Sequence, residues 1–116
     1  MEMNNTAKAV KPDIKLTLRE QEVFMILYLG KRFTTIDIAK RLGFTEGMVN
    51  LYLINLITKG VPVVKELLDD LLVFGLEPEF KDLQARRNVL EIDSRVAQQI
   101  STHTSEGRAV FSKSKN

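Results

Sequence analysis

Residues 34–60 read TTIDIAKRLGFTEGMVNLYLINLITKG, and this stretch decides the fold. A helix-turn-helix needs a small residue where its two helices cross, a turn residue that tolerates a positive φ, and an early apolar anchor in the second helix. Ala39, Gly43 and Val49 meet these needs in that order, and Thr45 is a good N-cap for the second helix. The stretch therefore predicts a helix-turn-helix.

Another helix is predicted before this motif. Thr17 and Glu20 have the spacing of a capping box, in which each side chain binds a free backbone N–H of the first turn. Gly30 is a natural stop for this helix. The first helix of the motif then begins at Thr34 or at Thr35, since either residue is a good N-cap.

Residues 63–76, VVKELLDDLLVFGL, fit two different structures. As a helix, the stretch places its apolar side chains on one face. As a hairpin, it turns at Asp69-Asp70 and pairs Val63–Leu67 with Leu72–Leu76, and its valines and phenylalanine favour strands. Periodicity alone favours the helix.

A further helical stretch is expected from Pro78 onward. Apolar residues recur there at spacings of three and seven, namely Phe80, Leu83, Leu90, Ala97 and Ile100. Such spacing is typical of a dimerisation helix, but Arg87 interrupts it, so the pattern leaves dimerisation undecided. Asp93 and Ser94 offer an alternative, in which they break the run and cap a separate final helix.

The composition fits one small domain. The 116-residue chain is 44% hydrophobic and has no cysteine, which excludes disulfides, thiolate zinc sites and cysteine nucleophiles. It contains neither an apolar run near the roughly 20 residues that span a bilayer nor a signal-peptide core, so a cytoplasmic protein is expected. Residues 1–60 hold nine Lys/Arg and six Asp/Glu, whereas residues 61–116 hold eight and nine. The positive excess therefore lies in the half with the helix-turn-helix.

Two further stretches resemble winged helix-turn-helix regulators. LTLREQEVF at residues 16–24 is similar to the first-helix entry of many such proteins. LLVFGLEPEFKDLQ at residues 71–84 resembles the second wing strand and the following helix of ArsR- and MarR-like repressors. The resemblance implies that residues 63–76 form the wing, against their helical periodicity. It also implies a duplex-DNA-binding transcriptional regulator, a repressor that acts as a homodimer.

The expected fold is mainly α with a small β-hairpin wing, and thus α+β: a winged helix-turn-helix with a three-helix core plus a C-terminal helix. Residues 1–14 are expected to form a flexible arm and residues 15–77 the winged domain. Residues 78–101 are expected to form the C-terminal helical segment, with dimerisation as one role, and residues 102–116 a flexible tail.

In such a fold the second helix of the motif enters the major groove with its N-terminal half. Its outward face is predicted to carry Glu46, Gly47, Asn50, Leu51 and Ile54, while Val49, Leu53, Leu56 and Ile57 face inward. Asn50 is the best base reader, because an amide can bind N6 and N7 of adenine together. Thr45 and Gly47 can offer hydroxyl and backbone N–H groups to a phosphate. Glu46 either accepts from cytosine N4 or, the preferred interpretation, favours the helix dipole.

Residues 45–58 contain neither Lys nor Arg, so phosphate contacts must come from elsewhere. Two basic pairs flank the first helix of the motif and are the predicted backbone contacts: Lys31, Arg32, Lys40 and Arg41. The acidic pair at the wing tip would repel phosphates, so this wing is not expected to enter the minor groove.

Other functions find less support in the sequence. It contains no P-loop, dinucleotide fingerprint or metal-spaced His/carboxylate motif, so neither an enzyme nor a cofactor is expected. The single histidine, His103, falls in the expected tail, which argues against metal sensing. Leu51 either packs on a thymine methyl or, with Ile54, marks a protein interface. The alternative is therefore a winged-helix protein-protein interaction module or a replication accessory of a mobile genetic element.

Overall fold

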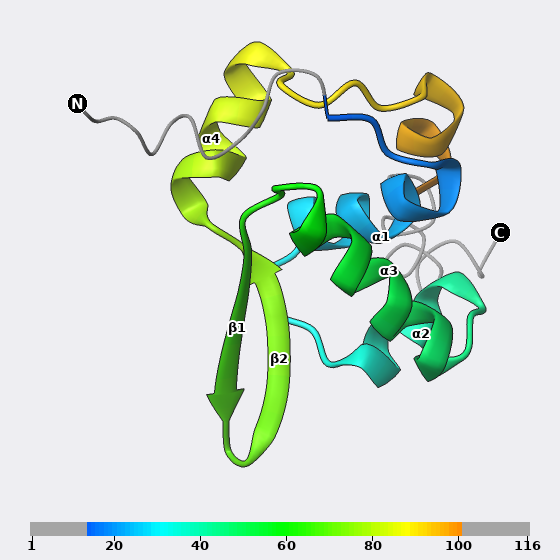
Figure 1. Ribbon diagram of the computed structural model, residues 1–116, viewed down its shortest axis with the longest axis vertical. Helices are drawn as coiled ribbons and strands as arrows, with labels where there is room; N and C mark the ends of the chain where they lie inside the picture. Colours follow the sequence, from blue (N-terminus) through cyan, green and yellow to red (C-terminus); the bar gives the residue numbers. More distant parts are fainter. Residues whose placement is uncertain (1–13, 101–116) are drawn as a thin grey trace, which may run out of the picture.

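The computed structural model describes residues 14–100 (Figure 1). Its elements, in chain order, are α1 (Leu18–Leu29), α2 (Thr35–Leu42), α3 (Glu46–Thr58), β1 (Val63–Leu68), β2 (Leu71–Leu76) and α4 (Pro78–Arg87). A last helix occupies residues 94–100. This order is that of a winged helix-turn-helix, so the predicted fold class is confirmed. Most of the expected N-terminal arm, and the expected tail with His103, lie outside the described residues.

The helix ends are fixed by the local signals that the sequence contains. Thr17 and Glu20 form the predicted capping box at the start of α1. Thr34 caps α2 in a second capping box, with Asp37. Gly43 ends α2 with a φ of 75° in the left-handed region, where a glycine carries no Cβ penalty. These caps set the turn that joins α2 to α3.

Residues 63–76 form the wing, a hairpin that projects from the helical body (Figure 1). β1 and β2 pair antiparallel, from Val63 opposite Leu76 to Leu68 opposite Leu71. The turn residues Asp69 and Asp70 have φ values of 51° and 67°, as in a two-residue type I′ turn. The wing predicted from the resemblance is therefore correct. The helix that periodicity favoured is not formed, because the end of β2 is buried against the core. A local sequence pattern does not reveal this burial.

The base of the wing is joined to the loop before α2. Phe33 and Phe74 exchange two backbone hydrogen bonds, with N–O distances of 2.9 and 2.7 Å. The next residue, Gly75, therefore lies very close to this loop. A Cβ at Gly75 would collide with the Lys31 carbonyl oxygen and would lie 2.6 Å from Nη1 of Arg32. Only a glycine fits between the strand and the loop.

Gly75→Ala is accordingly expected to lower the free energy of unfolding by about 1.5 kcal/mol, the scale of overpacking, because backbone must move to admit the methyl group. Urea denaturation would measure this loss. Gly47→Ala is the matched control, since the atom nearest to its added Cβ lies 3.9 Å away. An equal loss in both variants would show that the close approach at Gly75 does not constrain the wing.

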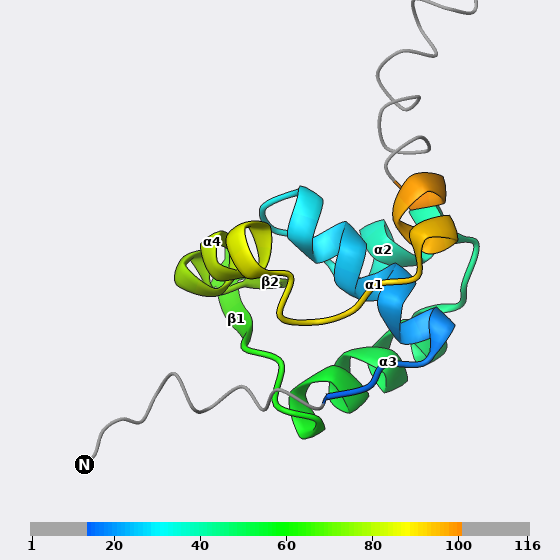
Figure 2. The ribbon, with the colours of Figure 1, turned by 90° about the horizontal axis from the view of Figure 1, so that it is seen from above.

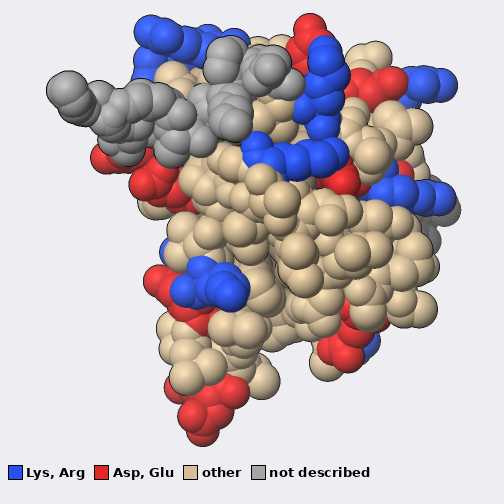
Figure 3. All heavy atoms as spheres, viewed as in Figure 1, with Lys and Arg blue, Asp and Glu red and all other residues tan. Residues whose placement is uncertain are grey.

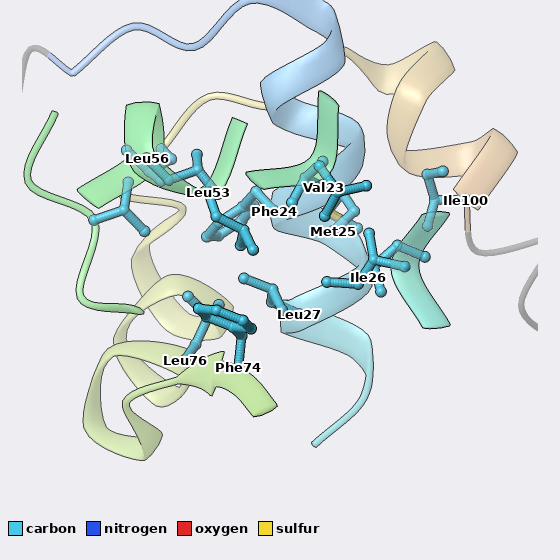
Figure 4. Packing of buried hydrophobic residues seen from close by; sticks show 14 of the residues in the cluster. Val23, Phe24, Met25, Ile26, Leu27, Leu53, Leu56, Phe74, Leu76 and Ile100 are labelled. Carbon is cyan, nitrogen blue, oxygen red and sulfur yellow. The ribbon is translucent and has the colours of Figure 1, made fainter. Parts of the chain in front are cut away.

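The core lies between α1, α3, β2 and the C-terminal segment. Figure 4 shows Leu53 and Leu56 of α3, and Phe74 and Leu76 of β2, gathered around α1 near Leu27. These side chains are at most 5% exposed. The wing base and α3 are thus fixed to the same helix, α1, which sets their relative position.

The C-terminal segment is not one continuous helix. α4 ends at Arg87, and its C-cap residue Asn88 has a left-handed φ of 54°. The chain becomes helical again after Asp93, whose carboxylate accepts from the Arg95 backbone N–H at 2.8 Å, so the alternative with a separate final helix is correct. Three residues of the apolar series are at most 3% exposed within this chain's own core: Phe80, Leu90 and Ile100. These three side chains therefore pack in the chain's own core, and dimerisation through this segment stays a prediction.

Candidate nucleic-acid interface

α3 is the candidate reading helix, and its inward face follows a simple spacing. Val49, Leu53 and Leu56 are at most 2% exposed and pack in the core between α1 and α2. Ile57 was predicted to face inward, but it is 42% exposed. The prediction was wrong because the inward face of α3 ends at Leu56, and Val61, beyond the helix, fills the next core position.

A buried carboxylate holds the C-terminal end of α3 to the start of α1. Glu20 accepts hydrogen bonds from Lys59 Nζ at 2.6 Å and from Asn55 Nδ2 at 3.0 Å. Burial raises the pKa of the Glu20 carboxyl, but the bonds from Lys59, Thr17 and Asn55 and the lysine charge outweigh burial. The pKa therefore lies below its ordinary value, and the carboxylate stays ionised.

The N-terminal half of α3 is held from the other side. Thr45 Oγ1 accepts from the Met48 backbone N–H at 3.1 Å, so its capping role is present and its hydroxyl hydrogen is still free to donate. Glu46 accepts from Thr35 Oγ1 at 3.3 Å, which ties the start of α3 to the start of α2. Glu46 thus has a positioning role that the sequence did not indicate.

The outward face of α3 is largely uncharged. Gly47, Asn50 and Leu51 are exposed, as the helical spacing predicts. Four apolar side chains on this helix are 40–58% exposed: Met48, Leu51, Ile54 and Ile57. Figure 2 shows that α3 lies on the side that faces the viewer in Figure 1. On that side, Figure 3 shows a broad uncharged surface over α3, with acidic groups at the wing tip.

The structure brings three of the four predicted basic residues to the loop between α1 and α2. The guanidinium of Arg41 lies over the Phe33 ring, 5.0 Å from its centroid. The neighbouring Arg32 donates to Glu66 of β1 at 2.8 Å and to the Lys31 carbonyl at 3.0 Å. The charge of Arg32 is therefore partly neutralised, whereas Lys31 and Arg41 are exposed.

The fourth residue, Lys40, is exposed on α2 and lies apart from these contacts. A further basic residue, Lys81 of α4, reaches the loop before α2, and no pattern in the sequence indicated it. Its Nζ donates to the Gly30 carbonyl, and burial, Arg32 and Lys31 all lower the pKa of its ammonium. Fifty-one positions separate Gly30 and Lys81, so no local pattern in the sequence indicates this contact.

The tip of the wing combines acidic and apolar groups. Asp69 and Asp70 are exposed at the turn. The leucines on both sides are 48–68% exposed, namely Leu67, Leu68, Leu71 and Leu72. Opposed leucine pairs alternate between the two faces of a hairpin, so both faces of the tip are apolar. Such a tip does not present the positive charge that a phosphate backbone attracts.

Residues 14–100 were searched for a membrane-spanning helix and for a metal site. No helix in this range has the length and apolar character needed to cross a membrane. Within the same range, no three His, Cys, Asp or Glu side chains are placed to hold a metal ion together.

Similarity to known proteins is found in structure and not in sequence. Neither a protein-family model nor a curated protein sequence matches the chain. The adhesin competence repressor AdcR of Streptococcus pyogenes matches with a TM-score of 0.53 and 20% identity, over 87% of this chain and 65% of that one. ZitR of Lactococcus lactis, a zinc-responsive MarR family member, matches with a TM-score of 0.52 and 16% identity, over 90% and 64%.

A ZitR variant in complex with DNA matches with a TM-score of 0.50 and 16% identity, over 97% of this chain and 68% of that one. The chain thus spans about two thirds of the length of these proteins. Its structural neighbours are MarR-family winged-helix regulators, as the resemblance at residues 71–84 implied. The chain shares their winged helix-turn-helix fold.

Proposed function

We propose that this chain is a transcriptional regulator that binds duplex DNA, with the N-terminal half of α3 in the major groove. The observation that carries the proposal is the exposed start of α3, where Gly47, Asn50 and Leu51 project from a helix fixed at both ends. A protein of the same fold is known in complex with DNA, which supports this role. The expected compartment is the cytoplasm.

Each exposed group on α3 has a chemically distinct role in this proposal. The Asn50 amide binds N6 and N7 of adenine. The Thr45 hydroxyl and the Gly47 backbone N–H donate to a phosphate at the helix N-terminus. Leu51 contacts a base edge, whereas Glu46 keeps α2 and α3 together.

Two basic residues before α2 and two in its last turn provide the phosphate contacts. Lys31, Lys40 and Arg41 are exposed and bind directly, and Arg32 contributes in part because Glu66 shares its charge. If all four neutralise a phosphate, the logarithm of the binding constant falls with a slope of about −3.6 against the logarithm of the salt concentration.

A fluorescence anisotropy titration of the full chain with mixed duplex DNA tests the proposal. We expect binding at about 50 mM salt that is weaker by on the order of 100-fold at about 200 mM, as counterion release requires. A chain that binds no duplex at the lower concentration does not have the proposed function.

We further propose that the regulator is a repressor that acts as a homodimer by occluding a promoter. A dimer would present its two α3 helices to major grooves about 34 Å apart on one face of the duplex. Light scattering should give twice the monomer mass for the full chain alone, and that mass plus the mass of one duplex for the complex with DNA. A single copy on a single half-site would contradict the dimer.

A protein-interaction module is the second candidate, and one observation favours it. Ile57, near the C-terminal end of α3, extends the apolar surface of this helix beyond the part that a major groove accepts. If this surface docks a protein, the duplex titration shows no binding and substitutions on α3 do not affect any contact with DNA.

Replacement of the wing turn by Asn-Gly, the preferred type I′ pair, has two expected effects. Asp69→Asn with Asp70→Gly should raise the free energy of unfolding by about 1 kcal/mol, because it relieves two positive φ values. It should also tighten duplex binding a few-fold at low salt, because it removes two carboxylates that repel phosphates. Thermal unfolding and the anisotropy titration measure the two effects.

Glu77→Gln with Glu79→Gln is the control, since it removes two exposed charges at the start of α4. It should leave duplex binding nearly unchanged. An increase in affinity as large as that of the wing variant would mean that net charge, and not the position of the wing tip, is responsible.

A further inference from the structure

The exposed face of α3 lacks the groups that most often read guanine. Arg and Lys bind O6 and N7 of guanine and provide the commonest specific contact in the major groove. Residues 45–58 contain neither, and Lys59 at the end of α3 is held by Glu20. No long cation of α3 can therefore reach a guanine edge.

The side chains that α3 exposes are suited to contact an A·T base pair. Gly47, Asn50, Leu51 and Ile54 follow the spacing i, i+3, i+4, i+7 and so lie on one face of the helix. Leu51 is 54% exposed and Ile54 is 58% exposed. The thymine C5-methyl is the apolar group that the major groove offers, and adenine is the base that an Asn amide binds with two hydrogen bonds.

The backbone at the start of this face is open. A Cβ added at Gly47 would have its nearest neighbour at 3.9 Å, so the side toward solvent is clear. A glycine here allows the helix to approach a groove closely, which a large side chain at the same position would prevent. Close approach is what brings Leu51, one turn further along, within reach of a methyl group on a base.

We propose that α3 selects A·T base pairs, with Asn50 on adenine and Leu51 and Ile54 on thymine methyl groups. This inference rests on the proposed function and adds the base composition of the target. It also accounts for the apolar surface of α3 as a reading surface, in place of a protein contact.

The test begins with selection of bound sequences from a random duplex pool by the full chain. We expect A·T-rich sites. One selected site is then prepared with deoxyuridine in place of thymine, which removes only the C5-methyl groups. Binding should weaken about fourfold for each methyl group that Leu51 or Ile54 contacts, the factor that corresponds to burial of one methylene.

Variants locate the effect on α3. Leu51→Ala and Ile54→Ala should each bind the thymine duplex more weakly and discriminate less between thymine and uracil. Leu18→Ala is the matched control, because Leu18 is 50% exposed on α1. The Leu18→Ala variant should discriminate between the thymine and uracil duplexes as strongly as the unchanged chain does. Both Leu51 and Ile54 are exposed, so their truncation leaves the core intact.

The outcomes separate the inference from the proposed function. A chain that retains no duplex from the pool overturns both and leaves the apolar face of α3 as a protein contact. Selection of G·C-rich sites, or equal affinity for the thymine and uracil duplexes, overturns the inference but not DNA binding. The same applies if Leu51→Ala and Ile54→Ala both keep the full discrimination.

Discussion

Replacing Lys40 and Arg41 together by glutamine is expected to weaken the binding of every duplex by on the order of 30-fold at 0.15 M salt. Two released counterions account for a factor of this size, and their loss should reduce the salt slope by about 1.8. The effect should not depend on the DNA sequence, since the proposed contacts of these residues are to phosphates and not to bases. Anisotropy titrations over a series of salt concentrations measure both quantities.

A matched control separates position from charge. Arg86→Gln with Arg87→Gln removes an adjacent basic pair that is also exposed, at the end of α4. It should change the affinity and the slope little. Because Arg41 also stacks on Phe33, the single variant Lys40→Gln should give about half of the change in slope without touching that contact. Equal weakening by both double variants would remove α2 from the DNA interface.

Lys59→Met is expected to lower the free energy of unfolding at neutral pH by about 3 kcal/mol, because it leaves a buried charge without its partner. The Glu20 side chain is only 4% exposed, and Lys59 Nζ is its nearest donor at 2.6 Å. Urea denaturation measures the loss. Lys65→Met, on the exposed part of β1, should have little effect.

The pH dependence identifies the carboxylate as the cause. The pKa of Glu20 in the folded chain lies below its ordinary value of 4.5, so its stabilising effect is present above that pH. The effect is lost as the pH falls through the lower, folded pKa. Without Lys59, the hydrogen bond and the charge of the lysine no longer lower the pKa of Glu20, so the carboxylate of the variant is protonated at a higher pH, which removes the unpaired buried charge. The gap between the two proteins should therefore narrow in acid, and a constant gap would contradict this cause.

The helix-turn-helix could be predicted because its signals are local. The capping box at Thr17, the small Ala39 and the left-handed Gly43 act within a few residues of their own position. Each is satisfied by backbone groups that the sequence places nearby. The ends of α1 and α2 agree with these signals.

The wing and the C-terminal segment depend on contacts between distant residues. The exposed leucines of the wing tip have the spacing of a helical face, and the resemblance to known winged helix-turn-helix proteins decided in favour of the hairpin. What makes it a hairpin is the pairing of Phe33 with Phe74 and the burial of the end of β2. Likewise, Phe80 and Ile100 share a spacing pattern that the left-handed Asn88 interrupts.

In the candidate site too, the features set by helical spacing could be predicted, and the contacts between distant residues could not. Helical spacing correctly placed Asn50 and Leu51 on the outward face of α3. It could not show that Glu66 partly neutralises Arg32, nor that Lys81 joins the basic loop, because these contacts cross 34 and 51 positions. The prediction that Ile57 faces inward was wrong for a related reason. Val61, which lies beyond the end of α3, fills the core position that the helical spacing assigned to Ile57.

Contact of α3 and the basic residues beside it with duplex DNA can be tested directly. The most direct measurement is the change in backbone amide shifts of the isotope-labelled full chain when a selected duplex is added at low salt. We expect the largest changes at residues 45–51, with further changes at Lys40 and Arg41. Changes confined to α4 and residues 94–100, with residues 45–51 unaffected, would contradict the claim.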